Sequence, residues 1–163
     1  MNIVHRDVKS DNILFESNDN NEEINIVLAD FGFATKFQPE EKLDLTLGTL
    51  LYMAPEIVKH EPYDSKVDIW GVGVILHILL KGAPPFVGSN STEVMEQIVN
   101  KDLEFSTGRA VSPEADQFIL QCLLKDPSQR PSAEELFNHP WLLMSASNED
   151  LSLSSQDDLS QNL

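Results

Sequence analysis

The sequence has little cysteine and no long apolar run. Cys122 is the single cysteine, so no disulfide can form within the chain, and its apolar neighbours predict a buried structural thiol in a reducing compartment. The longest apolar run, 69–80, is too short to span a bilayer, which takes about 20 residues. The first ten residues also lack the apolar core of a signal peptide. We therefore expect a soluble, cytoplasmic protein with no membrane partner.

Basic residues are scarce as well. Eleven Lys and Arg stand against 27 Asp and Glu, which gives a formal net charge of −16. Such a field repels nucleic acid phosphates and anionic lipid head groups, so we expect no nucleic acid partner. Cationic peptides are the more natural partners, although an acidic balance by itself is more often a solubility feature.

Two glycine-dependent motifs are also absent. The seven glycines never form a GxGxxG pattern, and no segment resembles the D-x-D-x-D-G loop of an EF-hand. The second absence predicts that calcium does not bind directly.

What is present predicts one folded domain. With 163 residues and 41% hydrophobic content, the chain can build a single core. We assign this domain to 1–144. Residues 145–163 contain no aromatic and no basic residue and cannot bury enough surface to offset their ordering entropy, so we expect a disordered acidic tail there.

The pattern of apolar residues predicts a mainly α fold with one short β-hairpin, made of strands at 13–15 and 24–29. Segments 1–12 and 30–56 follow no period and are expected to be loops. Four helices are expected: 67–80, buried all round; one from Asn90 to about 101; 113–124; and one capped by Ser132 and Glu135 that ends near 139–141.

The segment HRDVKSDN, residues 5–12, combines the groups that phosphoryl transfer requires. Such a reaction needs an acceptor for a hydroxyl proton, a cation on the moving phosphoryl group and oxygen ligands for magnesium. Asp7, Lys9 and Asn12 supply these in turn if a tight loop brings them together. Asp30, in DFG directly after a strand, could share the metal with Asn12. Taken singly, each of these residues could instead have a non-catalytic role, such as a turn cap or a solvated surface charge.

The order of the motifs is more specific than any one of them. HRDVKSDN, DFG, GTLLYMAPE and VDIWGVGVIL follow each other at the intervals of the protein kinase signature. Over about residues 1–144 the chain therefore resembles eukaryotic protein kinases, from the catalytic loop to the end of the fold. The resemblance implies the α+β kinase fold without its N-terminal lobe.

The resemblance also implies roles for individual residues. Asp7 is the expected catalytic base, Lys9 the γ-phosphate contact, and Asn12 and Asp30 the magnesium ligands, with ATP and magnesium as cofactors. Arg6 is expected to meet a phosphate on the activation segment.

Three further residues are given structural roles. The family pattern implies that Glu56 pairs with Arg130 and that Asp68 accepts backbone N–H groups of the catalytic loop. For Asp68 the physics agrees independently, because a lone carboxylate in an apolar helix is costly unless donors converge on it. Trp70 and Trp141 lie in apolar surroundings and are expected in the core.

Lys9 and Thr49 match the serine/threonine branch, so the acceptor is expected to be a Ser or Thr hydroxyl of a protein. Thr46 is the candidate for activating phosphorylation, although many kinases carry that residue one position earlier. The stretches GVILHILLKGAPPF and DPSQRPSAEELFNHPWL are most similar to the calcium- and calmodulin-dependent kinase group.

No glycine-rich loop, VAIK-like lysine or hinge occurs in the sequence. We therefore expect these residues alone to bind ATP poorly and to be inactive, with exposed apolar surface where an N-terminal lobe would sit. A non-catalytic kinase-like interaction module remains an alternative. A small-molecule phosphotransferase is a narrower one, against which GTLLYMAPE and the Glu56–Arg130 pairing argue.

Overall fold

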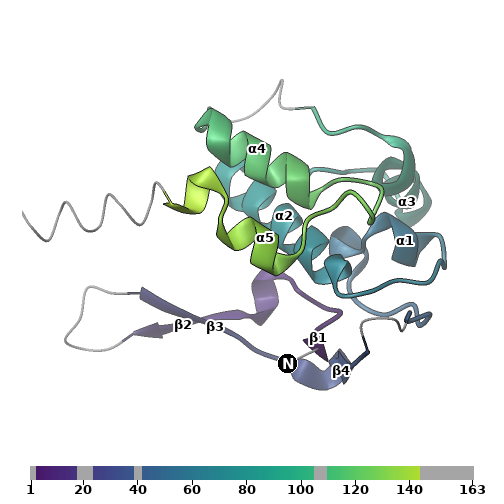
Figure 1. Ribbon diagram of the computed structural model, residues 1–163. Helices are drawn as coiled ribbons and strands as arrows, with labels where there is room; N and C mark the ends of the chain where they lie inside the picture. The colour runs from purple at the N-terminus through teal and green to yellow at the C-terminus, as the bar shows by residue number, and fades with distance from the viewer. Residues whose placement is uncertain (1–2, 18–23, 39–41, 105–109, 144–163) are drawn as a thin grey trace, which may run out of the picture.

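A computed structural model describes residues 3–17, 24–38, 42–104 and 110–143. Helices are the main secondary structure of this part, and two small two-stranded sheets lie along one side of them (Figure 1). The expected acidic tail, 145–163, lies outside the described residues.

The predicted hairpin is present. Strands β2 (Ile13–Ser17) and β3 (Ile24–Leu28) pair antiparallel, with Ile13 opposite Leu28. The hairpin projects away from the helices, and its base joins the segment that precedes it in the chain (Figure 1). This arrangement brings the residues before β2 next to the residues after β3.

The expectation of plain loops in 1–12 and 30–56 is wrong in detail. A second pair of strands, β1 (Ile3–Val4) and β4 (Thr35–Lys36), joins these two segments. Two residues are too few to show a period of two, and the pairing depends on a partner distant in sequence. The same segments contain three short 3₁₀ turns: η1 (Ser10–Asn12), η2 (Phe31–Phe33) and η3 (Leu50–Tyr52).

The central helix α2 (Lys66–Lys81) passes through the core. Trp70 and Val74 are fully buried, but the prediction of burial on every side is wrong at Leu79, which is 66% exposed. An apolar sequence does not tell which side of a helix has no neighbour. The helix ends at Gly82, which takes the left-handed conformation with φ 83°. Among the described helices none has the length and apolarity needed to cross a membrane.

The remaining helices begin where the sequence predicts them. Asn90 accepts the N–H of Glu93, and Ser112 that of Ala115. Ser132 and Glu135 form a reciprocal capping box. The short helix α1 (Pro55–Val58) precedes α2 in the chain. Three helices follow α2: α3 (Ser91–Asn100), α4 (Pro113–Cys122) and α5 (Ala133–Phe137).

The core fixes the position of residues 5–12. Gly71 on α2 lies so close to this segment that an added Cβ would be 2.7 Å from the carbonyl oxygen of Val8.

Nearby, Trp70 stacks on Phe86 with ring centroids 5.7 Å apart. Cys122 is buried, which raises the pKa of its thiol to about 12, as expected for a structural thiol.

Candidate active site

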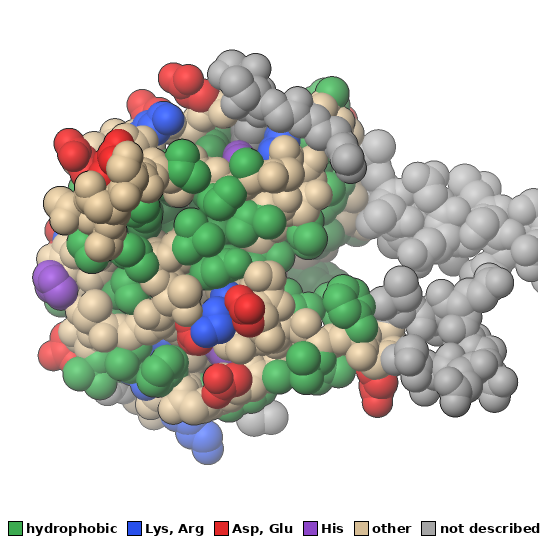
Figure 2. All heavy atoms as spheres, turned by 180° about the vertical axis from the view of Figure 1, so that it is seen from behind, with side chains coloured by type: hydrophobic (Ala, Val, Ile, Leu, Met, Phe, Trp, Pro, Cys, Tyr) green, Lys and Arg blue, Asp and Glu red, His purple; other side chains and the backbone are tan. Residues whose placement is uncertain are grey.

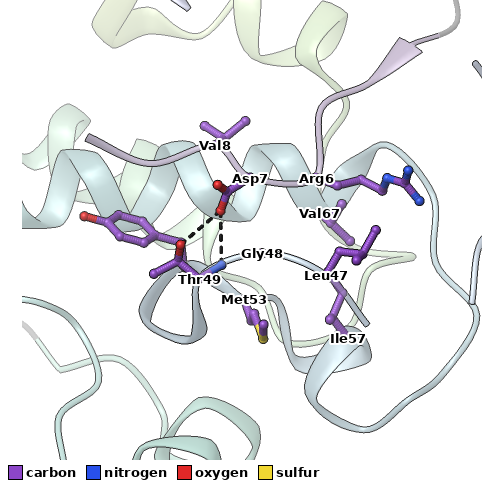
Figure 3. A pocket seen from close by; sticks show the side chains of 10 residues that line it. Arg6, Asp7, Val8, Leu47, Gly48, Thr49, Met53, Ile57 and Val67 are labelled. Carbon is purple, nitrogen blue, oxygen red and sulfur yellow. Dashed lines mark hydrogen bonds between the residues drawn. The ribbon is translucent and has the colours of Figure 1, made fainter. Parts of the chain in front are cut away.

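The carboxylate of Asp7 is the centre of a hydrogen-bond network. Its Oδ1 accepts the backbone N–H and the hydroxyl of Thr49, each at 3.1 Å (Figure 3). Its Oδ2 lies 2.6 Å from Lys9 Nζ. Burial alone would raise the pKa of Asp7, but the bonds from Lys9 and Thr49 outweigh it and hold the pKa below its ordinary value of 3.8. The carboxylate is therefore ionised at neutral pH.

Lys9 closes the network. Besides the bond to Asp7, its Nζ donates to Thr49 Oγ1 at 3.0 Å. The hydrogen bond to Asp7 raises the pKa of Lys9, and the negative charges of Asp11 and Asp30 add to the effect. The site therefore holds a paired carboxylate and ammonium, with further negative charge close by.

Asn12 and Asp30 are brought together by the base of the hairpin. The carbonyl oxygen of Asn12 accepts the N–H of Ala29 at 2.8 Å, which puts Asp30 one residue beyond this contact. The Asn12 side chain is buried and donates to the carbonyl oxygen of Asp7 at 2.9 Å. Asp30 has φ 58° and accepts the N–H of Gly32 with its Oδ1.

The donor set fits magnesium better than a metal that needs a protein cage. Within the described ranges, no group of three or more His, Cys, Asp or Glu side chains could hold a metal ion. Asn12 and Asp30 offer an amide oxygen and a carboxylate. Magnesium is commonly bound by one or two carboxylates together with water and substrate phosphates, so these two residues would hold it.

His5 is a residue to which the sequence analysis gave no role. Its Nε2 lies 3.0 Å from the carbonyl oxygen of Ala29, its Nδ1 accepts the N–H of Asp7, and its ring meets Phe31 edge-on with centroids 4.9 Å apart. His5 thus joins the segment around Asp7 to the segment around Asp30. Its place directly before Arg6 and Asp7 was the available signal, but the partners appear only in the fold.

Asp68, on α2, holds the start of the same segment. Its two carboxylate oxygens accept the backbone N–H groups of His5 at 2.7 Å and of Arg6 at 2.9 Å. Burial raises the pKa of Asp68, and these two bonds oppose the rise without cancelling it. Arg6 has φ 70°, so the chain turns sharply just before Asp7.

Gly48 allows Thr49 to reach Asp7. It has φ 102°, and an added Cβ would lie 2.7 Å from the carbonyl oxygen of Arg6. Only a glycine permits this close approach of the two backbones. Figure 3 shows Thr49 and Asp7 facing each other across the contact, while Arg6 points away from Asp7.

Glu56 and Arg130 form a buried ion pair. Arg130 Nη1 lies 2.7 Å from Glu56 Oε1, and Nη2 lies 3.1 Å from Oε2. Further donors of the guanidinium reach the carbonyl oxygens of Leu124 and Lys66. The pair joins α1 to the chain before α5.

Thr46 and Arg6 have different partners. Thr46 Oγ1 lies 2.8 Å from Nδ1 of His60. Arg6 Nε donates to the carbonyl oxygen of Phe33 at 2.6 Å. The contact between Arg6 and a phosphate on the activation segment stays a prediction.

The lowered pKa of Asp7 predicts a pH effect on stability. A carboxyl with a lowered pKa in the folded state stabilises the fold above its unfolded pKa and loses that contribution as the pH falls through the folded value. Wild type is therefore expected to lose more free energy of unfolding than Asp7→Asn when the pH falls from neutral to below 3.8. Urea denaturation of both proteins across this range measures the difference, and equal losses would contradict the prediction.

A family model described as protein kinase domain matches residues 1–142. The chain is 42% identical over 143 residues to SNF-related serine/threonine-protein kinase of Homo sapiens, an alignment that covers 87% of this chain and 18% of that protein. It is 40% identical over 150 residues to myosin light chain kinase A of Dictyostelium discoideum, covering 91% and 50%. With calcium-dependent protein kinase 4 of Plasmodium falciparum the identity is 38% over 154 residues, covering 93% and 29%.

The chain thus spans half or less of the length of these relatives. The match and the identities confirm the family predicted from the order of the four motifs. The chain belongs to the protein kinase domain family, and its homologues are serine/threonine kinases of the calcium- and calmodulin-dependent group.

Proposed function

We propose that this chain forms the acceptor side of a serine/threonine protein kinase, which transfers the γ-phosphate of ATP to a hydroxyl of a protein. The network of Asp7, Lys9 and Thr49 is the observation that carries the proposal. It sets a carboxylate held ionised beside a cation, with Asp30 close enough to add to the charge around Lys9. Phosphoryl transfer depends mainly on such positioned charges.

Each residue has a separate task. Asp7 accepts the hydroxyl proton, and its lowered pKa keeps it unprotonated until the substrate arrives. Lys9 moves its ammonium from Asp7 toward the transferred phosphoryl group. Asn12 and Asp30 hold magnesium. When bound, ATP supplies the phosphoryl group and magnesium neutralises its charge.

The proposed substrate class follows from the match to the serine/threonine branch of kinases and from the net charge of the chain. Lys9 and Thr49 contact each other at 3.0 Å, and both match the serine/threonine branch. The net charge of −16 favours a basic peptide around the acceptor hydroxyl. We therefore propose a basic Ser- or Thr-containing protein segment as substrate, with ATP and magnesium as cofactors.

The hairpin offers a surface for an ATP-binding lobe. Leu14, Phe15 and Ile26 are 53%, 74% and 65% exposed, and Phe31 next to Asp30 is 58% exposed. Figure 2 shows that apolar side chains are also exposed on the face opposite to that of Figure 1. A flat nucleotide base or a second protein lobe would cover such exposed apolar surface. Without a glycine-rich loop, the 163 residues are expected to bind ATP weakly.

The test is a transfer assay in two forms of the protein. The chain is assayed alone and as a chimera behind the ATP-binding lobe of the human SNF-related kinase, with ATP, magnesium and a basic serine peptide. The chimera is expected to transfer phosphate. Asp7→Asn should lower the rate by about 10²–10⁴-fold, and Asp30→Ala should abolish the magnesium-dependent transfer. Asp11→Asn, which removes an exposed charge from the same loop, is the matched control.

The alternative is a non-catalytic interaction module, which the exposed apolar hairpin also favours. A folded chimera that binds ATP but transfers nothing would support this alternative. Transfer that survives Asp7→Asn would contradict the role proposed for Asp7.

A further inference from the structure

Ser10 and Tyr52 share a hydrogen bond that has no part in the proposed function so far. Ser10 Oγ lies 2.8 Å from the hydroxyl oxygen of Tyr52. Ser10 comes directly after Lys9 and begins the turn η1. Tyr52 ends the turn η3, which directly follows Thr49. The bond therefore joins the two segments that surround the active-site carboxylate.

Both hydroxyls extend from backbone that is itself hydrogen-bonded. Tyr52 donates its N–H to the carbonyl oxygen of Thr49 at 2.8 Å, and its ring packs against the apolar core. On the other side, Asn12 donates its N–H to the carbonyl oxygen of Lys9 at 3.1 Å. A tyrosine whose ring is packed in the protein usually has a partner for its hydroxyl, and here that partner is Ser10. The bond thus connects one ordered turn to another.

The other side-chain bonds described between these segments involve groups that act in the proposed transfer. Thr49 donates to Asp7 Oδ1, and Lys9 Nζ reaches both of these residues. In the proposed reaction Asp7 takes up a proton, so it loses the negative charge that strengthens its bonds from Thr49. Lys9 moves its ammonium to the phosphoryl group and gives up its bond to Asp7. The bond between Ser10 and Tyr52 uses neither group, so it can persist through the transfer.

We propose that Ser10 and Tyr52 are positioning residues, which hold the backbone of Lys9 in place while its ammonium moves from Asp7 to the phosphoryl group. A lysine side chain is a flexible stem, so the position of its Cα decides which atoms the ammonium can reach. The Cα atoms of neighbouring residues are about 3.8 Å apart, so a bond that fixes Ser10 also restricts Lys9. The purpose of this tether rests on the proposed kinase function, but the tether itself can be tested without activity.

The first experiment measures amide hydrogen exchange in the whole 163-residue chain. The reporters are the Tyr52 N–H in the turn after Thr49 and the Asn12 N–H in the turn after Lys9. Ser10→Ala and Tyr52→Phe should each speed the exchange of both amides by about 2- to 10-fold, the effect of losing one hydrogen bond. The double variant should show no further acceleration, because either substitution already removes the bond.

A Lys9→Met background tests whether the tether holds once the ammonium has left Asp7. The acceleration caused by Ser10→Ala should keep its full size in this background. Its disappearance there would overturn the proposal, as would accelerations by Ser10→Ala and Tyr52→Phe that add in the double variant. Ser89→Ala, which removes an exposed hydroxyl from the loop before α3, is the matched control and should leave both reporters unchanged. Wild-type exchange of the α2 amides shows that each variant folds.

The second experiment uses the chimera of the transfer assay. Because the tether acts while Lys9 is displaced, Ser10→Ala should lower kcat by about 2- to 10-fold and leave the KM for the peptide unchanged. A raised KM with an unchanged kcat would show that the two hydroxyls bind the substrate, and the positioning role would then be wrong. If the chimera transfers nothing, the proposed function fails, while the exchange rates still decide whether the tether between Ser10 and Tyr52 exists.

Discussion

Arg130→Met is expected to lower the free energy of unfolding by about 3–5 kcal/mol. Arg130 is fully buried and Glu56 is 2% exposed, so the substitution leaves a carboxylate in the interior without its cation. Methionine fills much of the volume of arginine, so little of the loss comes from a cavity. The carbonyl oxygens of Leu124 and Lys66 also lose their donor. Urea denaturation followed by circular dichroism measures the change.

A second substitution distinguishes charge from packing. If the unpaired carboxylate causes the loss, Glu56→Leu in the Arg130→Met background should restore part of the stability. Glu61→Gln is the matched control, because its pair with Lys59 is exposed and exposed pairs contribute about 0–1 kcal/mol. A double variant less stable than Arg130→Met would contradict the explanation.

Asp68→Ala is expected to have the second largest effect, both on stability and on the order of residues 5–12. The substitution leaves the backbone N–H groups of His5 and Arg6 without their acceptor, at a cost of about 1–3 kcal/mol each. Burial raises the pKa of Asp68, so the ionised carboxylate is itself destabilised in the fold. Removing this carboxylate offsets part of the cost. The net loss of free energy of unfolding should therefore lie near the lower end of about 1–3 kcal/mol for each N–H group.

Amide hydrogen exchange locates this effect. In Asp68→Ala the His5 and Arg6 amides should exchange much faster than those of α3, which has no contact with the carboxylate among the bonds described. Asp68→Asn keeps one acceptor oxygen and should show an intermediate change. If the His5 and Arg6 amides remain protected in Asp68→Ala, the anchoring role is wrong.

The helices could be predicted because their signals are local. The Asn90, Ser112 and Ser132 caps each act within three residues of their own position. The pairing of β1 with β4 could not be predicted, since each strand has two residues and its partner is more than thirty positions away. The prediction that Leu79 is buried was wrong for a related reason, because its exposure depends on which elements pack around α2.

The site divides in the same way. The residue types of Asp7, Lys9, Asn12 and Asp30 could be selected from motif order, and their roles remain proposals. His5 was missed because a histidine becomes a connector only when Ala29 and Phe31 reach it from the other side of the hairpin. The contact of Thr46 with His60 was missed because it crosses between two segments with no pattern of their own.

The sequence by itself determined the family, the helix starts and the chemical groups available for phosphoryl transfer, because these depend on residue type and short spacing. The tertiary structure decided which groups contact each other. Thr49 donates to Asp7, and Asp68 accepts the backbone N–H groups of His5 and Arg6. Glu56 pairs with Arg130. It also decided their ionisation, since the pKa of Asp7 is lowered by donors and that of Asp68 is raised by burial. Lys9 lies only two residues from Asp7, but the bonds from Thr49 to Asp7 and the burial of Asp68 depend on segments far apart in the chain, and local sequence does not encode those distances.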